Sequence, residues 1–340
     1  MLPRISIILV CRNEEKYIEK CLDSVLDNGY PADKMDIVVV DGESTDKTRD
    51  IVRAFQEKTS CVRLVSNPGI TAAAGLNVGL KAAHEEFIVR LDAHASYEKD
   101  YLLKSVTYLE RYQADNVGGV IETVSSEDTL IGRSIARLLS SSFGVGLSHF
   151  RIGVNAPSEV ATVPFGSFRK SFLEKLGGFD EDMTRCEDID MNLRIKAAGG
   201  KIMLFPDIKL RYFSRTSLIP FLRHTFNNGY LITVTLKHKK FKVLFYHIVP
   251  LLAVATGLTL IVGSVFSKLA LGTFLLLSVV YLFITLVYTT SICRQSRDIR
   301  YAVTLPWLFF VTHVAYGLGS IWGILIAAGD LLRIKPRFYA

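Results

Sequence analysis

Three long apolar stretches near the C-terminus constrain the fold of this chain most strongly. They cover His247 to Phe266, Leu269 to Ser291 and Ala302 to Ala328, and none of them contains Lys, Arg, Asp or Glu. Because about 20 apolar residues in a helix can cross the hydrocarbon layer, each stretch predicts a transmembrane helix. Residues 1 to about 236 alternate apolar and polar segments instead. We therefore expect an integral membrane protein whose N-terminal part is a soluble domain.

Basic residues beside these stretches predict their orientation. A basic cluster at residues 237–242 precedes the first stretch, and three arginines at residues 294–300 lie between the second and the third. The positive-inside rule places both groups in the cytoplasm. A complete third span would put Arg333, Lys335 and Arg337 outside, against the same rule. The third stretch contains Pro306 and several glycines, so a kinked or re-entrant segment that returns the tail inside is the alternative.

Charge and cysteine content narrow the class of protein. The net charge is +7, but the basic residues gather near the apolar stretches, where anionic lipid accounts for them better than nucleic acid does. Five scattered cysteines without a CxxC pair indicate free thiols in a reducing compartment. The first apolar run, Ile5 to Val10, is too short for a signal peptide. We expect the N-terminal part in the cytoplasm and no nucleic-acid partner.

The soluble part begins with four repeats of a strand followed by a helix. The expected strands are Ile5 to Val10, Met35 to Val40, Val62 to Val65 and Phe87 to Leu91. This alternation predicts a mostly parallel α/β sheet between helices. A further strand is expected at 116–123 and amphipathic helices at 130–139 and 218–237. Neither GxGxxG nor GxxxxGK[ST] occurs, which argues against a dinucleotide-binding fold and a P-loop.

The end of the fourth strand carries Asp92 and, after one small residue, His94. Residues i and i+2 of a strand share one side, so both side chains could reach one ion or phosphate at the edge of the sheet. The alternative is an ordinary helix cap at Asp92. The second strand ends similarly in Asp41-Gly-Glu-Ser-Thr-Asp46, which could contact a nucleotide or form a plain turn. Asn13, after the first strand, is expected to cap the next helix.

A dense acidic segment follows in the second half of the soluble part. Six of the twelve residues from Phe179 to Asp190 are acidic, and Asp188 is expected to open a helix. One interpretation is a general base held beside a metal site. The other is the usual enrichment of acids at a helix N-terminus. Spacing leaves both open. The helix at 218–237 suits the headgroup plane of a membrane, and its arginines could bind a pyrophosphate bidentately.

The order of these motifs resembles the family 2 glycosyltransferases, which are inverting enzymes with the GT-A fold. The branch it resembles is the membrane-bound glucosyltransferases of bacterial exopolysaccharide synthesis, of the succinoglycan ExoA type. The motifs, in family order, are Cys11-Arg-Asn-Glu-Glu15, Val40-Asp-Gly-Glu-Ser-Thr-Asp46, Asn67-Pro-Gly69, Leu91-Asp-Ala-His-Ala95, Phe143-Gly-Val-Gly146, Pro164-Phe-Gly166, Gly177-Gly-Phe-Asp180, Glu187-Asp188 and Ser214-Arg-Thr-Ser217.

The resemblance implies a role for each matching position. Asp188, with Glu187, would be catalytic, Asp188 as the base that deprotonates an acceptor hydroxyl. Asp92 and His94 would hold Mg²⁺ or Mn²⁺, and because His94 replaces the usual second Asp, the preference would move towards Mn²⁺. The nucleotide sugar would be bound by Val10, Arg12, Glu14, Asp41, Ser44, Asn77, Asp92 and Arg215.

The implied function is transfer of a sugar, such as glucose from UDP-glucose, to a hydroxyl of a lipid-linked saccharide. A polyprenyl-phosphate sugar synthase and a non-catalytic nucleotide- or lipid-binding membrane module are the alternatives. The expected organisation is a cytoplasmic GT-A domain at 1–215, an interface helix and basic linker at 216–242, and a membrane domain at 243–340. The partners would be the donor, the lipid-linked acceptor and the lipids of the inner (plasma) membrane.

Overall fold

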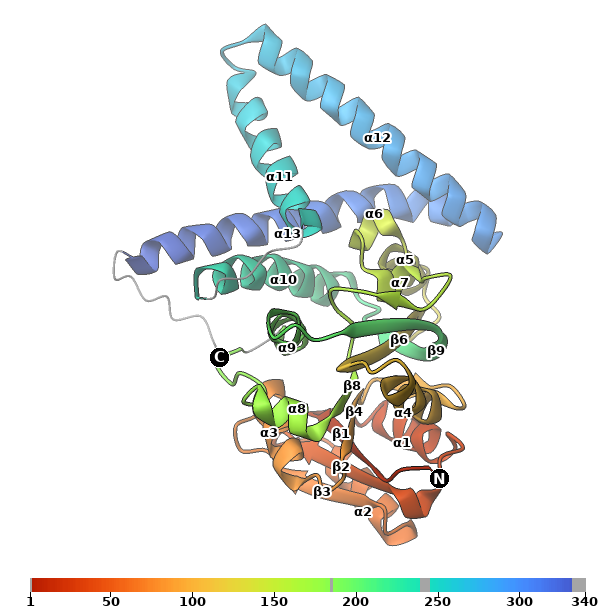
Figure 1. The fold of residues 1–340 in the computed structure, drawn as a ribbon. Coiled ribbons are helices and arrows are strands. Elements are labelled where there is room, and N and C mark those ends of the chain that lie inside the picture. The colour runs from red at the N-terminus through yellow and green to blue at the C-terminus, as the bar shows by residue number, and fades with distance from the viewer. Residues whose placement is uncertain (1, 184–185, 239–244, 332–340) are drawn as a thin grey trace. The chain divides into compact units, whose positions relative to one another are not determined.

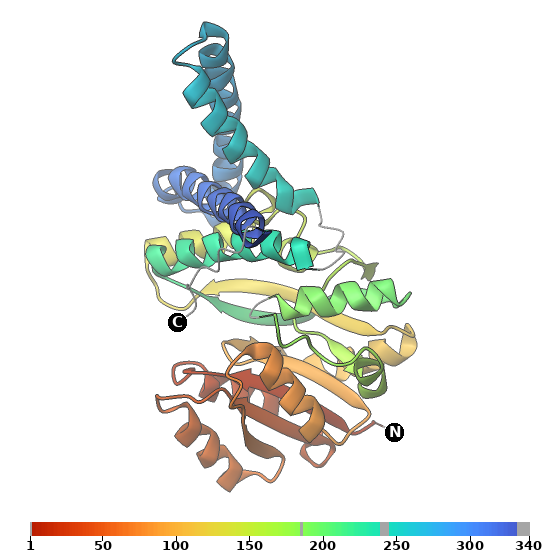
Figure 2. The same ribbon diagram turned by 90° about the vertical axis from the view of Figure 1, so that its left-hand side faces the viewer.

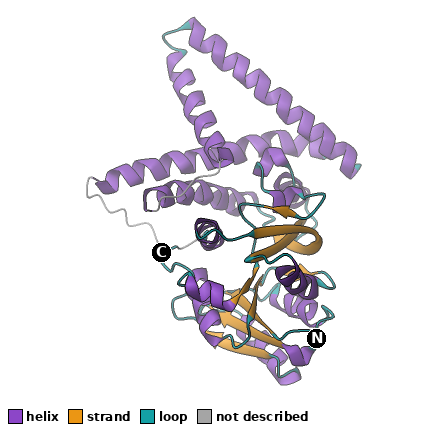
Figure 3. Cartoon of the chain, in the orientation of Figure 1, coloured by secondary structure: helices purple, strands orange, loops and turns teal. Residues whose placement is uncertain are grey.

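The computed structural model describes residues 2–183, 186–238 and 245–331. The basic residues expected at 239–242 and at 333–337 therefore lie outside the described residues. The chain forms two compact units, one of residues 1–122 and 149–213, the other of residues 123–148 and 214–340. Strands gather in the first unit, and the described elements after β9 are all helices (Figure 3).

The described elements, in chain order, are β1 (Ile5–Cys11), α1 (Ile18–Leu26), a 3₁₀ turn (Ala32–Lys34), β2 (Met35–Asp41), α2 (Thr48–Lys58), β3 (Val62–Ser66), α3 (Ala72–Ala82), β4 (Phe87–Asp92), β5 (Ala95–Tyr97), α4 (Tyr101–Arg111), β6 (Asn116–Ser125), α5 (Leu130–Leu139), α6 (Ser142–Val145), α7 (His149–Ile152), β7 (Ser158–Glu159), β8 (Ser167–Arg169), α8 (Lys170–Lys175), α9 (Glu187–Ala197), β9 (Ile202–Ser214), α10 (Leu218–His238), α11 (Phe245–Gly263), α12 (Lys268–Ser296) and α13 (Tyr301–Leu331).

The first half of the sheet is parallel, as the sequence predicts. Its strands run in the order β3-β2-β1-β4, and each neighbouring pair is parallel (Figure 1). Every predicted strand among these four is confirmed to within one residue at either end. The four carboxyl ends consequently meet at one edge, and Asp41 and Asp92 are the last residues of β2 and β4.

The second half of the sheet corrects the expectation of a mostly parallel sheet. The order continues β4-β8-β6-β9-β5, with β8 antiparallel to β4 and β5 antiparallel to β9. The thirteen-residue strand β9 has no counterpart in the sequence-based expectation. Pro206 interrupts its apolar run, although the alternation of charged and apolar side chains after it is itself typical of a half-buried strand. The sheet is therefore mixed.

Two apolar layers cover the two faces of the sheet. Ile5, Ile7 and Leu9 of β1 point to one face, where they pack with residues of α1, α2 and α4. Ile8 points to the other face and packs with residues of α3, α8 and α9. This alternation is the period of two that a strand buried on both faces requires. The sheet is thus held rigidly, which fixes the positions of the residues at its carboxyl edge.

The second unit is a group of helices with its own core. Ile135 and Leu138 of α5 pack with Phe221 of α10 and with residues of α12 and α13. Two helices, Lys268–Ser296 and Tyr301–Ala328, are long and apolar enough to cross a membrane, and the apolar helix His247–Gly263 is shorter. The sequence-predicted apolar stretches therefore correspond to α11, α12 and α13.

Candidate active site

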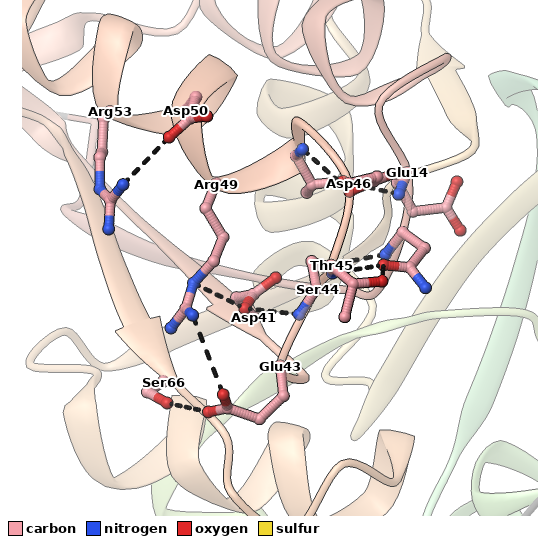
Figure 4. Close-up of polar contacts among 12 residues, drawn as sticks. Glu14, Asp41, Glu43, Ser44, Thr45, Asp46, Arg49, Asp50, Arg53 and Ser66 are labelled. Carbon is pink, nitrogen blue, oxygen red and sulfur yellow. Dashed lines mark hydrogen bonds and ion pairs between the residues drawn. The ribbon is translucent and has the colours of Figure 1, made fainter.

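Hydrogen bonds join the loop after β1 to the loop after β2 at the carboxyl edge of the sheet. The Asn13 backbone N–H donates to Ser44 Oγ over 2.9 Å, and the Thr45 N–H donates to Asn13 Oδ1 over 2.8 Å (Figure 4). Asn13 has a positive φ of 56° and does not cap a helix, because α1 begins only at Ile18 and lacks a side-chain cap. The expected cap is thus wrong, and Asn13 instead shapes the rim of the site.

Asp41 lies fully buried where these loops meet. Its Oδ2 accepts the Ser44 backbone N–H over 3.1 Å and faces Arg49 Nε over 3.1 Å (Figure 4). Its other oxygen, Oδ1, is buried and has no hydrogen-bond partner among the described residues. A buried carboxylate oxygen without a partner costs roughly 1–3 kcal/mol or more, so its retention is explained best by a ligand donor that completes it. This geometry suits the N–H of a nucleotide base.

Asp92 and His94 lie together at the end of β4. His94 Nδ1 is 2.8 Å from Asp92 Oδ1 and 3.2 Å from Glu14 Oε1, while Nε2 is 2.9 Å from the Tyr212 hydroxyl. Burial opposes charge on the ring, but Asp92, Tyr212 and Glu14 together hold the pKa of His94 well above its ordinary value. Burial likewise opposes charge on Asp92, but His94 lowers the pKa of that carboxyl. Asp92, Glu14 and Tyr212 thus form a compact cluster around the His94 ring.

The donor atoms of this cluster fit a divalent cation in part. Asp92 and Glu14 offer oxygen, and His94 would offer nitrogen once it releases the proton that its raised pKa retains, a set that then suits Mn²⁺ better than Mg²⁺. Among the residues that the structure describes, no group of three or more His, Cys, Asp or Glu side chains is arranged to enclose a metal ion. Such ions usually keep waters and bind substrate phosphates beside one or two protein ligands. Asp92 and His94 thus fit a site that a diphosphate would complete.

Arg90 links the same strand to the acidic helix α9. It lies two residues before Asp92, is buried, and places its Nη2 2.5 Å from Glu187 Oε1. Burial disfavours the guanidinium charge, yet Glu187, Asp188 and Asp92 outweigh this and raise the pKa of Arg90. Glu187 is therefore engaged by Arg90. This contact holds the start of α9 beside β4, and the catalytic role that the sequence predicts for Glu187 stays a prediction.

Asp188 is the acidic residue of α9 whose chemistry differs from the others. Burial raises the pKa of its carboxyl above the ordinary value, the negative charge of Glu187 raises it further, and Arg90 lowers it. Its Oδ1 accepts the N–H of Ile189 over 2.8 Å. A carboxylate with a raised pKa in a partly buried site is a suitable general base.

The structure does not bring every predicted residue to this site. The Asn77 amide donates to the Phe179 carbonyl and to Glu181 and accepts the Phe179 N–H, so it ties α3 to the segment before α9. The contact of Asn77 with the nucleotide sugar therefore stays a prediction. Val10 lies beside Asp92 in the sheet, and Arg12 is exposed after β1. Arg215 belongs to the second unit, so its contact with a pyrophosphate stays a prediction.

Three residues with a place in the site are absent from the sequence-predicted set. Arg90 and Tyr212 make the contacts above, and Arg151 stacks on the Tyr212 ring with its guanidinium carbon 5.4 Å from the ring centre. Burial lowers the pKa of Arg151, although the charges of Tyr212 and Asp188 oppose this. A charged residue within the apolar run Phe87–Asp92 was the available signal for Arg90. Tyr212 and Arg151 carry no comparable signal.

Known proteins resemble this chain in sequence. The Glycosyl transferase family 2 model matches residues 6–177, which is half of the chain. A Methanococcus voltae protein named dolichyl N-acetyl-alpha-D-glucosaminyl phosphate 3-beta-D-2,3-diacetamido-2,3-dideoxy-beta-D-glucuronosyltransferase is 28% identical over 94% of this chain and 97% of its own length. The succinoglycan biosynthesis protein ExoA of Rhizobium meliloti is 28% identical over 66% of this chain and 67% of its own length.

A solved structure agrees on the fold. The mannosyltransferase PcManGT from Pyrobaculum calidifontis, in complex with GDP-Man and Mn²⁺, superposes with a TM-score of 0.62 at 20% identity, covering 95% of this chain and 88% of that one. At this identity the likeness concerns the fold alone. The family match, the mixed sheet and the relatives together show that the chain belongs to glycosyl transferase family 2, as a glycosyltransferase with a GT-A-like α/β domain.

Proposed function

We propose that this glycosyltransferase moves a sugar, with inversion, from a nucleotide donor to a hydroxyl group of a lipid-linked saccharide. The observation that carries the proposal is Asp188, a carboxylate whose pKa is raised by burial, at the N-terminus of a helix that Arg90 ties to the strand of Asp92. A hydroxyl nucleophile needs such a base, whereas a phosphate acceptor does not. UDP-glucose is the donor with which we would begin.

The residues of the site suit a single displacement. Asp188 takes the proton of the acceptor hydroxyl while that oxygen bonds to the anomeric carbon, and the bond from this carbon to the diphosphate breaks with its electrons leaving on the diphosphate. Asp41 holds the base of the nucleotide, and Asp92 with His94 faces the diphosphate. A divalent ion, when bound there, would neutralise the charge that develops on the leaving group. Arg215 would add a second positive charge.

The names of the relatives support a lipid-linked or polysaccharide acceptor. The Methanococcus voltae relative is named for transfer to a dolichyl-phosphate-linked sugar, and the Rhizobium meliloti relative for succinoglycan biosynthesis. Because the first relative matches nearly its whole length, we favour a lipid-linked saccharide over a bare polyprenyl phosphate. The Mn²⁺ named with the Pyrobaculum calidifontis enzyme supports Mg²⁺ or Mn²⁺ as the cofactor.

The decisive experiment is a donor screen with the full-length protein in membranes. UDP- and GDP-sugars are supplied with Mn²⁺ or Mg²⁺, once with a lipid-linked saccharide and once with polyprenyl phosphate. Release of nucleoside diphosphate only with the saccharide supports the proposal, and release with the phosphate alone favours the polyprenyl-phosphate synthase. Donor binding without turnover on both acceptors favours a non-catalytic module.

The cellular arrangement is part of the proposal. We infer a multi-pass protein of the inner (plasma) membrane whose catalytic part, at 1–215, faces the cytoplasm, where nucleotide sugars are made. Residues 216–242 would form the interface helix and basic linker, and residues 243–340 the membrane domain. Residues 123–148 pack with the C-terminal helices, so this segment would join the catalytic part to the membrane domain.

Replacing Asp41 with Asn is expected to weaken nucleotide binding about 10- to 100-fold, the usual range for losing a hydrogen bond to a charged acceptor. The NH₂ group of the amide would place a donor where Asp41 Oδ1 now offers an acceptor, so it would face the N–H donor of the ligand. Titration calorimetry with UDP measures the change. Asp36→Asn is the matched control, because Asp36 pairs with Arg63 near the start of β2. An unchanged UDP affinity in a folded Asp41→Asn protein would contradict the assignment.

Replacing His94 with Asp is expected to change the metal preference. The imidazole nitrogen favours Mn²⁺, and an all-oxygen pair should raise the ratio of kcat/KM with Mg²⁺ to kcat/KM with Mn²⁺. Chelation of metal should abolish turnover in both proteins, and each metal should restore it to a different degree. The assay is donor turnover with each ion in turn. Equal ratios in the two proteins would remove His94 from the metal site.

A further inference from the structure

Helix α13 has an outer face that is apolar and exposed along its length. The exposed side chains recur at helical spacing and include both tryptophans of the chain; they are Val303, Trp307, Phe310, Leu318, Trp322 and Leu325. A continuous exposed apolar face on this scale requires a partner other than water. Tryptophan is enriched where membrane hydrocarbon meets the headgroups, because its ring is apolar and its N–H is polar.

The inner face of the first half of α13 is covered by α5 and α6. Thr304 Oγ1 lies 2.7 Å from Ser134 Oγ of α5, and His313 Nε2 lies 2.8 Å from the Phe143 carbonyl oxygen of α6. Leu305, between them, is completely buried in the same core as the apolar residues of α5. The polar groups of this half of α13 therefore all lie on the side that the protein covers.

The inner face of the second half is covered by α10, which runs beside α13 in the same direction (Figures 1 and 2). The backbones come so close that a Cβ at Gly319 would collide with the Phe226 carbonyl oxygen, and one at Gly323 with Thr233. A Cβ at Gly229 of α10 would in turn collide with the Tyr316 carbonyl oxygen. Glycines thus let the two helices pack along most of the length of α10.

The helices that cover α13 are unsuited to the interior of a bilayer. Helix α5 has ten residues, about 15 Å at 1.5 Å per residue, and carries Arg133 and Arg137. Helix α10 carries Arg223, which is exposed. If α13 crossed the membrane, its neighbours would carry these arginines into the hydrocarbon, at roughly 2.5–3.5 kcal/mol for each one near the centre. The length and composition of α13 would allow a span, but the arginines of its neighbours oppose one.

Helix α12 differs from α13 in being covered less by protein: 6% of its apolar window is buried, against 33% for α13. Helices α11 and α12 form a hairpin that stands away from α10 and α13 in both views (Figures 1 and 2). Its tip is free, with Phe266 85% and Leu269 80% exposed. Its base rests on α13, since a Cβ at Gly317 would meet the Pro250 carbonyl oxygen, and Cys293 lies in the core that α13 shares. Helix α11 has 19 residues and α12 has 29, about 28 Å and about 43 Å, which compares with roughly 30 Å of hydrocarbon.

We propose that the membrane is crossed only by the α11–α12 hairpin, and that α13 lies in the plane of the interface with its tryptophan face against lipid. The occupant of that face is the headgroup and upper acyl region of the leaflet next to the catalytic unit. Two crossings return the chain to its starting side, so the tail with Arg333, Lys335 and Arg337 stays there. The positive-inside rule is then obeyed throughout, including by the exposed Arg294 and Arg297 at the end of α12.

The depth of α13 in the bilayer tests this arrangement. Three proteins with a single tryptophan each are reconstituted in lipid vesicles. The first keeps Trp307, the second keeps Trp322, and the third carries Leu318→Trp. In each protein the other native tryptophans are changed to Phe. Phosphatidylcholines brominated at shallow, middle or deep acyl positions quench each fluorophore according to its depth. A spanning α13 would separate Trp307 from Trp322 by about 22 Å and place position 318 near the middle of the bilayer. A Leu276→Trp protein, with the label on α12, is the deep control.

Equal, shallow depths at all three positions of α13, with a deep Leu276→Trp control, support the proposal. Quenching of Leu318→Trp that is strongest with the deep bromines, as in the control, overturns it. A peptide tag added after Ala340 provides a second test that leaves every helix unchanged. In sealed inverted vesicles the tag should be cleaved by added protease together with the catalytic unit, and a protected tag would overturn the proposal whether or not the enzyme is active.

Discussion

Replacement of Asp188 by Asn is expected to lower kcat by about 10²- to 10⁴-fold while leaving the affinity for the nucleotide sugar nearly unchanged. The amide has almost the same size as the carboxylate and still accepts the Ile189 N–H through its oxygen, so the start of α9 should keep its geometry. It cannot take a proton from the acceptor hydroxyl. The measurements are turnover at saturating donor and acceptor, and donor binding by calorimetry.

The acidic segment before α9 offers the matched control for this variant. Asp182 lies six residues before Asp188 and is exposed, so Asp182→Asn changes the same charge by the same substitution outside the proposed catalytic contact. It should keep turnover within about twofold, as surface substitutions usually do. If Asp188→Asn retained the wild-type kcat, Asp188 would not be the base. An acceptor that needs no deprotonation, such as a phosphate, would then be the better explanation.

The part of this site that the sequence predicts is the part that local chemistry determines. An apolar run that ends in a carboxylate predicts both a strand and the residue at which it ends. The sequence therefore predicts that Asp41 and Asp92 lie at one edge of a parallel sheet. The structure confirms that both are the last residues of their strands. Helix α9 was likewise predicted, because its acidic start and its glycines after Ala197 are local features.

The remaining features depend on contacts between residues that are distant in the sequence. His94 meets Glu14 across 80 positions and Tyr212 across 118, and no pattern in the sequence pairs them. For the same reason the sequence does not predict that Arg90, 97 positions before Glu187, engages the carboxylate of Glu187. The sequence does not predict β9, because the ends of this strand depend on its pairing with β5 and β7, which are distant in the sequence.

Replacing Arg90 with Met is expected to impair both stability and catalysis. The change leaves the buried Glu187 carboxylate without its partner, and breaking a buried ion pair in this way costs about 3–5 kcal/mol. It also removes the positive charge that lowers the pKa of Asp188, so that pKa should rise further. A base must be deprotonated to act, so the acidic limb of kcat/KM against pH should move to higher pH. Thermal unfolding and a pH profile measure the two effects.

Two further variants separate the stabilising role of Arg90 from its electrostatic role. The double variant Arg90→Met/Glu187→Leu removes both charges, so it should recover most of the lost stability, since a buried pair replaced by apolar groups is often neutral. Because Glu187 raises the pKa of Asp188 and Arg90 lowers it, losing both should bring the acidic limb back towards the wild-type position. Arg63→Met, which breaks a partly exposed pair with Asp36, should leave that limb unmoved. If the acidic limb of kcat/KM shifted by the same amount in all three variants, loss of stability would explain the shift. The effect of the Arg90 charge on the pKa of Asp188 would then be excluded as its cause.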